Sequence, residues 1–230
     1  MIVATAVCPH PPLLMRELTG IQDAAADLRG VCVSAVSSLL SVPDLDVVVV
    51  VGGGDASGEG VSGGDPAHLY AARPRTEGER LLPLSLAVAH RLLGAVDHGV
   101  PVETATVAWD APAGEIAVLG RTLARRAPRV GLLVMADGGT RWGVMAPGHL
   151  EGASVDVDRA VGEALAAGDA RALLDVDPRQ ADEQRVGGRA ALQVMAAAVA
   201  EGPVVPRPEP LYHDAPFGIT YFVAVWSCDC

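Results

Sequence analysis

Short apolar runs alternate with amphipathic stretches along most of the chain. The runs have the length of strands that are covered on both faces of a sheet, and the stretches between them repeat with helical spacing. The runs predict strands at 2–7, 46–51, 102–108 and 130–135. The stretches between them predict helices at 22–41, 84–95 and 114–127. Strands that alternate with helices in this order are typical of an α/β fold.

The pattern becomes mainly helical after Asp137 and closes with one more strand. Helices are predicted at 154–167, 169–175 and 178–200. The final stretch, 217–226, is rich in aromatic and β-branched residues and predicts a last strand. No internal repeat and no long linker divides the chain. We therefore expect a single domain over 1–230, with a mixed, largely parallel sheet flanked by helices on both faces.

A glycine-rich stretch at 52–80 interrupts the pattern. Structureless loops of this length are uncommon in compact domains and are usually functional or mobile. Its opening, GGGDASG, looks like a phosphate-binding glycine loop, but it has neither the GxGxxG spacing nor a terminal lysine. We therefore expect a surface loop here rather than a nucleotide site.

Composition and charge narrow the classes of function. The 230 residues are half hydrophobic and carry a formal net charge of −11, and every basic residue is an arginine. The lack of lysine excludes Schiff-base chemistry, and the acidic balance argues against a nucleic-acid partner. No apolar run approaches the roughly 20 residues of a membrane span, and no basic region precedes the first run. We expect a cytoplasmic protein with no membrane partner.

A histidine held between prolines follows the first predicted strand. The segment reads AVCPHPPLL, with His10 between Pro9 and Pro11. Each proline fixes its own φ, removes a donor and favours extended geometry in the preceding residue, so strand pairing ends here. His10 is therefore expected on a rigid loop at the carboxyl edge of the sheet, where open α/β sheets bind their ligands.

Other polar candidates also follow predicted strands or precede the last one. They are Asp55, Asp137, Arg141, His213 and Asp214, the last two in the predicted turn LYHDAPFG. Histidines and carboxylates are adequate ligands for a hard divalent metal, which makes His10, Asp55, Asp137 and His213 a possible ligand set. Alternatively, carboxylates at glycine turns bind their own backbone.

Six segments carry a resemblance to a known family. They are CPHPPLL, VVVVVGGG, APGHLEGASVD, GDARALLDVDP, GGRAALQVMAAAV and YHDAPFGITYFVA. In this order and spacing they resemble the subunit-B-type (LigB-like) domain of class III extradiol ring-cleavage dioxygenases, and most closely the small bacterial LigB-like proteins related to Memo proteins. The resemblance implies an α/β sandwich around a mixed sheet. It also implies Fe(II) bound by two histidines and a glutamate, with a further histidine as acid and base while O₂ opens a catechol.

The resemblance places these four positions in the present sequence. The first metal histidine falls on His10, and the second position falls at Gly52–Gly54. The acid–base position carries Arg141, and the glutamate position carries Arg185. A guanidinium stays protonated and offers no lone pair to iron. The resemblance therefore implies a degenerate metal site, with no cofactor expected.

These substitutions lead to a hypothesis about ligand binding. Arg141 and Arg185 would clamp a small carboxylate or phosphate, with the His10 loop and Trp142 as walls. Alternatively, Arg185 pairs with Asp182 and Arg141 pairs with Asp137.

Two classes of function follow. One is a binding or regulatory module for a small anionic or aromatic ligand. The other is an active Fe(II)-dependent ring-cleavage oxidoreductase that uses substitute ligands. A homo-oligomer is also compatible with the apolar last strand.

Overall fold

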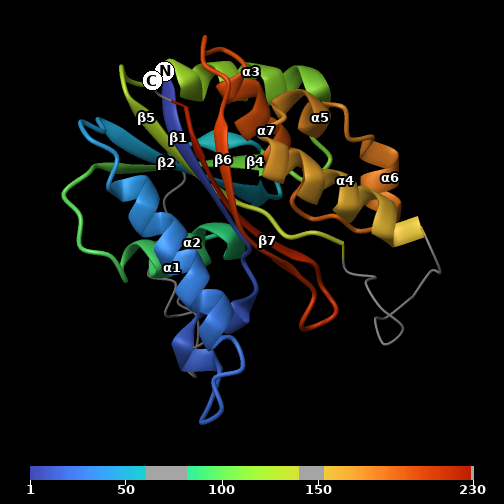
Figure 1. Cartoon of the computed structure of the whole chain (residues 1–230). Coiled ribbons are helices and arrows are strands. Elements are labelled where there is room, and N and C mark those ends of the chain that lie inside the picture. The colour runs from blue at the N-terminus through green and yellow to red at the C-terminus, as the bar shows by residue number, and fades with distance from the viewer. Residues whose placement is uncertain (61–81, 140–152, 229–230) are drawn as a thin grey trace, which may run out of the picture.

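The computed structural model describes residues 1–60, 82–139 and 153–228. Within these ranges the strands form one seven-stranded mixed sheet in the order β3-β4-β2-β5-β1-β7-β6 (Figure 1). The strands are β1 (Ile2–Cys8), β2 (Val47–Gly54), β3 (Gly58–Glu59), β4 (Val102–Ala108), β5 (Val130–Met135), β6 (Arg207–Asp214) and β7 (Tyr221–Ser227). The predicted α/β class is confirmed, and all five predicted strands are present.

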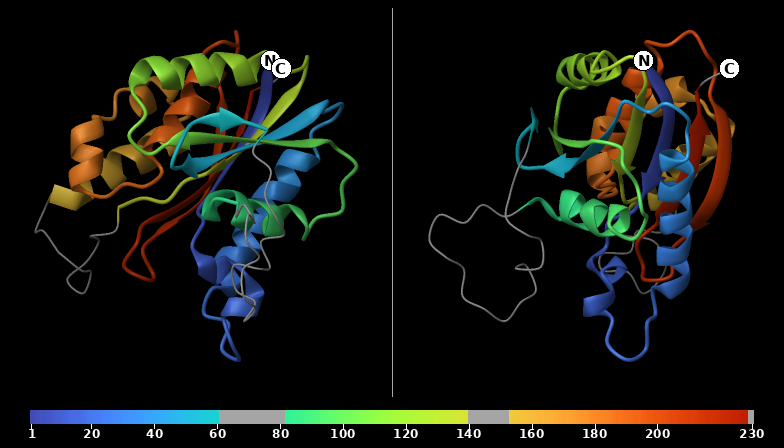
Figure 2. Two further views of the ribbon diagram at one scale, coloured as in Figure 1. Left: turned by 180° about the vertical axis from the view of Figure 1, so that it is seen from behind. Right: turned by 90° about the vertical axis from the view of Figure 1, so that its left-hand side faces the viewer.

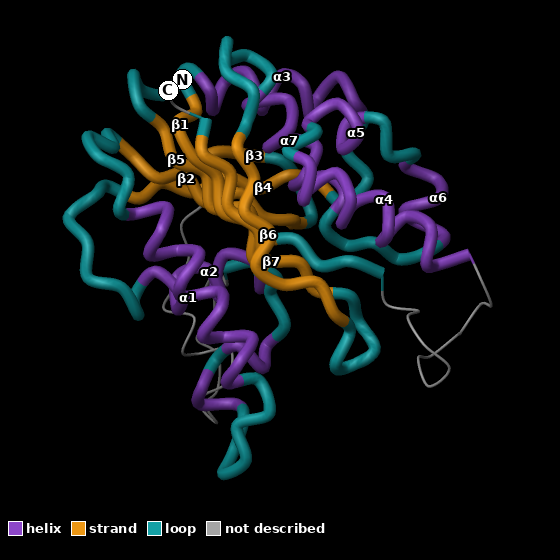
Figure 3. The backbone as a smooth tube through the Cα atoms, viewed as in Figure 1, coloured by secondary structure: helices purple, strands orange, loops and turns teal. Residues whose placement is uncertain are grey.

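Four neighbouring strands in the middle of the sheet are parallel. β4 pairs with β2, β2 with β5, and β5 with β1, all in parallel register, whereas β3, β7 and β6 join antiparallel. Figure 3 shows the strands as one twisted layer. Because the four parallel strands run the same way, the residues that follow them meet at one edge of the sheet. That carboxyl edge holds the candidate site.

Helices cover both faces of the sheet (Figures 1 and 2). On one face lie α1 (Ala26–Leu40) and α2 (Leu84–Leu93). On the other lie α3 (Ala113–Ala124), α4 (Ala153–Ala167), α5 (Ala170–Leu174), α6 (Pro178–Glu183) and α7 (Arg189–Val199). The five valines of Val47–Val51 alternate between the two hydrophobic clusters, and each is at most 5% exposed. This double cover is why β2 is continuously apolar rather than alternating.

The prediction of one continuous helix at 178–200 is wrong, because the segment forms two helices, α6 and α7, with a break at Arg185. After α6 the chain turns with Arg185 at φ 54°, in the left-handed region. The N–H of Val186 donates to the carbonyl of Ala181 (2.8 Å), and that of Arg185 to the carbonyl of Asp182 (2.9 Å). These two bonds make a Schellman motif, which usually has glycine where Arg185 stands. The glycine pair Gly187–Gly188 then leads into α7.

The segment LYHDAPFG is not simply the predicted turn, because its first four residues belong to β6. β6 pairs antiparallel with β7, and its prolines Pro208 and Pro210 fit an edge strand, where fewer backbone donors are needed. β7 therefore lies between β1 and β6. The apolar composition of the last strand follows from this interior position, and a homo-oligomer stays a prediction.

The beginning of the glycine-rich stretch also differs from the prediction. Gly52–Gly54 continue β2 and pair with β4, Gly52 also pairs with β5, and β3 follows shortly after. The rest of that stretch, 61–80, lies outside the described residues. No helix in the described part of the chain is long and apolar enough to cross a membrane.

Candidate functional site

His10 occupies the predicted position at the carboxyl edge of the sheet. β1 ends two residues earlier, and the prolines lead into 3₁₀ turns at Pro12–Leu14 and Arg16–Leu18. The backbone N–H of His10 donates to Oδ1 of Asp137 (2.8 Å), and its Nε2 lies 3.6 Å from Oδ2 of the same carboxylate. The structure thus brings together two of the predicted candidates, one from the end of β1 and one from beyond β5.

Burial dominates the electrostatics of this pair. It raises the pKa of Asp137 above its usual value, although the proximity of His10 and the N–H bond from its backbone act in the opposite direction. The side chain of His10 is 8% exposed. Its buried Nδ1 has no hydrogen-bond partner within the described ranges.

Trp109 covers the glycines at the end of β2. Its ring stacks on His10, with 6.3 Å between ring centroids and 29° between planes. A Cβ atom placed on Gly53 would overlap Cζ3 of Trp109, and one on Gly52 would overlap the Ser85 hydroxyl. The glycines are therefore required by close packing. An indole ring and a serine side chain fill the space beside the position where the resemblance implies the second metal histidine.

A cavity adjoins Trp109 at this edge of the sheet. It measures about 460 Å³ and lies between the loop after β4, helix α6 and the start of α7. We call it the arginine cavity, and its polar and aromatic lining consists of Trp109, Asp110, Arg179, Asp182, Arg185 and Arg189. Its volume falls within the range of small-molecule sites, about 300–1,000 Å³.

Arg189 is a buried cation in the wall of the arginine cavity. It is 5% exposed, and its guanidinium donates to the carbonyls of Trp109 (2.8 Å) and Ala111 (3.2 Å) and to Oε1 of Gln193 (3.0 Å). Burial lowers its pKa, and the more distant Asp110 and Asp182 oppose that effect. Within the described chain, no carboxylate comes within ion-pair distance of it. The positive charge is therefore balanced only at longer range.

Arg185 lines the same cavity, as the clamp hypothesis requires, and it is exposed. The alternative pairing of Arg185 with Asp182 is wrong, because only the backbone N–H of Arg185 binds the Asp182 carbonyl. Arg179 and Asp110 also make no ion pair with any residue that the structure describes. Arg141 and Trp142, the other half of the predicted clamp, lie outside the described residues, and so does the predicted alternative pairing of Arg141 with Asp137.

Of the four substitute metal ligands, only His10 and Asp137 come together. Asp55 is exposed beyond β2, and His213 lies in the edge strand β6, which β7 separates from β1. The ring of His213 packs on Phe222, with 4.8 Å between centroids. Among the residues that the structure describes, no group of three or more His, Cys, Asp or Glu side chains could hold a metal ion. The described donors therefore do not fit the two-histidine, one-carboxylate iron site that the resemblance implies.

Asp158 fixes the turn that carries Asp137. Its buried carboxylate accepts hydrogen bonds from the Thr220 hydroxyl and from the N–H of Gly139 (2.8 Å). Burial raises the pKa of Asp158, while Thr220, Gly139 and the nearby His213 act to lower it. The carboxylate thus ties α4 to the segment that follows β5.

Two residues of this region, Arg189 and Asp158, were not predicted from the sequence. The available signal for Arg189 was a charged residue inside the apolar segment GGRAALQVMAAAV, four residues before Gln193, with which it shares a helix face. A charge on an apolar helix face is a candidate for a buried role. Asp158 gave no comparable signal, because its partners are distant in the sequence.

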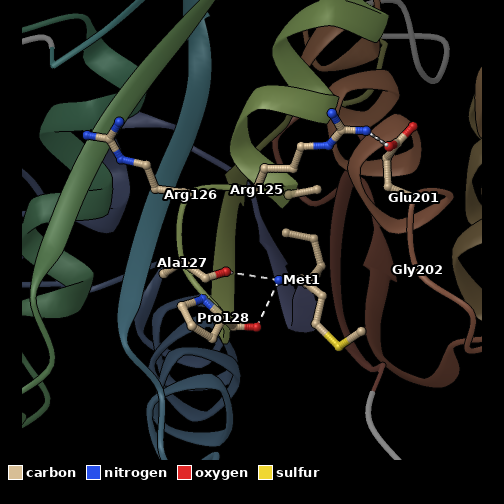
Figure 4. Close-up of a pocket in the computed structure, with 9 residues that line it drawn as sticks. Met1, Arg125, Arg126, Ala127, Pro128, Glu201 and Gly202 are labelled. Atoms are coloured by element: carbon tan, nitrogen blue, oxygen red, sulfur yellow. Dashed lines mark hydrogen bonds and ion pairs between the residues drawn. The ribbon is translucent and has the colours of Figure 1, made fainter.

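A second, larger cavity of about 560 Å³ lies at the amino edge of the sheet (Figure 4). There the Met1 ammonium donates to the carbonyls of Ala127 (3.0 Å) and Pro128 (2.8 Å), and Arg125 pairs with Glu201 (3.1 Å). Arg126, the other arginine of this lining, pairs with Glu103 (2.6 Å). Both arginines of this lining already pair with carboxylates, in contrast to the arginines of the arginine cavity.

Comparisons with known proteins identify the fold only. No protein-family model matches the chain, and no curated protein sequence matches it. Among solved structures, the chain is similar to the uncharacterized protein JW3007 from Escherichia coli K12, with 13% identity and a TM-score of 0.58. The similarity covers 98% of this chain and 99% of that one. At this identity the similarity shows a shared fold and no more.

Proposed function

We propose that this protein binds a small anionic ligand, a carboxylate or a phosphate, in the arginine cavity. The observation that carries the proposal is the buried guanidinium of Arg189, which has no ion-pair partner among the described residues. A buried charge is unfavourable unless an opposite charge approaches it. Three arginines and two aspartates line the cavity, so the lining attracts an anion.

The guanidinium groups suit this ligand chemistry. Each presents a planar set of N–H donors that matches the two oxygens of a carboxylate or phosphate. Arg189 is held in place by two backbone carbonyls, while Arg185 is exposed in the same lining. In this arrangement Arg189 supplies a fixed charge and Arg185 supplies donors that can adjust to the ligand.

We further propose that the chain is a divergent LigB-like protein with a degenerate metal site. The order of the six resembling segments supports this proposal, together with the mixed α/β sheet and His10 at its carboxyl edge. Arg185 stands at the position of the expected glutamate, and Trp109 packs over the glycines at that of the second histidine. The proposal favours binding over ring cleavage, because the described donors do not form an iron site.

Thermal denaturation with added anions tests the binding proposal. Acetate, benzoate and phosphate, compared with chloride at equal ionic strength, should raise the melting temperature in at least one case. A ligand at 100 times its Kd stabilises by about 2.7 kcal/mol, which for a domain of this size corresponds to roughly 5–10 °C. Arg185→Ala should remove most of the shift.

The matched control is Arg121→Ala, an exposed arginine of α3 that does not line the cavity. This variant should keep the full shift. The proposal fails if no anion stabilises the parent protein, or if Arg185→Ala responds as the parent does. Separately, stoichiometric iron or manganese in protein purified without chelator, together with cleavage of catechol to a yellow product, would establish the oxygenase alternative instead.

A further inference from the structure

The arginine cavity carries unpaired charges of both signs. Asp110 lies just beyond β4 and Asp182 lies on α6, and both line the same 460 Å³ space as the arginines. In the described structure neither carboxylate forms an ion pair with Arg179, Arg185 or Arg189. Opposite charges that share a cavity without contacting each other remain available to a ligand.

The two carboxylates share the cavity lining with Arg189, so both can act on a ligand bound there. Both raise the pKa of Arg189 through space, against the larger effect of its burial. A carboxylate ligand that contacts Arg189 would therefore also lie within their field and be repelled by them. A positive group on the ligand, placed toward Asp110 or Asp182, would turn this repulsion into attraction.

The remaining lining is apolar. Ala181 and Val186 form part of it, and Trp109, which is 45% exposed, lies in the same lining. Such surface is suited to an uncharged hydrocarbon side chain of the ligand.

We infer that the ligand is a free α-amino acid with an apolar side chain. Its carboxylate would bind Arg185 and Arg189, its ammonium would face Asp110 and Asp182, and its side chain would lie along Trp109. This inference rests on the proposed anion site and adds a positive charge on the ligand, which the two aspartates would bind. It predicts that removing either charge from the ligand weakens binding, because each sign has its own partners.

Isothermal titration of the full chain with matched probes tests the inference. The probes are L-valine, L-leucine, L-methionine and L-phenylalanine, each compared with the acid that lacks the amino group and the amine that lacks the carboxylate. For at least one of the four, the amino acid should bind at least tenfold more tightly than its acid. The amine should show no measurable binding.

Variants separate the two halves of the site. Asp182→Asn and Asp110→Asn should each weaken binding of the amino acid severalfold and leave binding of the matched acid unchanged or tighter. Arg185→Ala should weaken both by about tenfold or more. Asp97→Asn, an exposed aspartate outside the cavity, serves as the matched control and should change neither.

The outcomes distinguish this inference from the proposal beneath it. If acids or phosphate bind with Arg185-dependent affinity but no amino acid binds more tightly than its acid, the inference is wrong and the anion site stands. The same conclusion would follow if Asp110→Asn and Asp182→Asn did not weaken binding of the amino acid. If neither acids, phosphate nor amino acids bind, both the inference and the anion site are refuted.

Discussion

Arg185 stores backbone strain at the mouth of the proposed binding site. It sits at φ 54° in the position of the Schellman motif after α6 where glycine is usual. For a residue with a Cβ atom, the left-handed conformation costs about 1–2 kcal/mol. Glycine avoids this cost but loses about 0.4–1 kcal/mol more through the greater freedom of the unfolded chain. Arg185→Gly should therefore be more stable than Arg185→Ala by about 0.5–1 kcal/mol.

The two variants give a clean comparison, because both remove the guanidinium and only one removes the strain. In a domain of 230 residues, 1 kcal/mol corresponds to roughly 2–4 °C in melting temperature. In thermal denaturation, Arg185→Gly should melt about 1–4 °C above Arg185→Ala, and in urea denaturation it should unfold at a higher urea concentration. Both variants should lose the stabilisation by anions. Equal melting temperatures, or a lower one for Arg185→Gly, would refute the assignment of strain to this residue.

Two further predictions concern the packing around the site. Gly53→Ala should lower the free energy of unfolding by about 1–3 kcal/mol and shift the tryptophan fluorescence, because the new Cβ displaces the Trp109 ring. The control is Gly58→Ala, whose Cβ meets no atom within 4 Å, and it should change neither the stability nor the fluorescence. Asp158→Asn should gain stability relative to the parent as the pH rises above about 3.8, because burial holds the pKa of Asp158 above that ordinary value in the folded state. The protonated Asp158 stabilises the folded parent at low pH, and the parent loses this stabilisation as the pH rises through the folded pKa. A difference in unfolding free energy between parent and variant that stays constant from pH 3.5 to 7 would contradict this prediction.

The strands and most helices were predictable from local pattern because burial on both faces leaves continuous apolar runs. The valine run of β2 is the clearest case, since its residues alternate between two separate clusters. The break at Arg185 was missed, although the glycine pair Gly187–Gly188 shortly after it is a local signal for a helix break. β6 was missed for a different reason. Its prolines and charges are those of an exposed edge strand, and its partner β7 is required to show that it is a strand at all.

The candidate site was predicted in part. His10 and Asp137 meet at the carboxyl edge of the sheet because parallel strands end there, which strand order alone indicates. Arg185 lines a cavity as expected. Arg189 was missed because its partners, the carbonyls of Trp109 and Ala111, lie about 80 positions earlier in the chain. Contacts of this separation depend on the packing of α7 against the loop after β4, which no local pattern encodes.

The most direct test of the account is a crystal structure with a bromine-labelled carboxylate. 3-Bromopropionate soaked into crystals of the full chain can be located by the anomalous signal of its bromine atom. We expect bromine density in the arginine cavity, with the carboxylate oxygens within hydrogen-bond distance of the guanidinium of Arg185 or Arg189. Bromine density only elsewhere, or an empty arginine cavity at saturating concentration, would contradict the claim that this cavity binds anions.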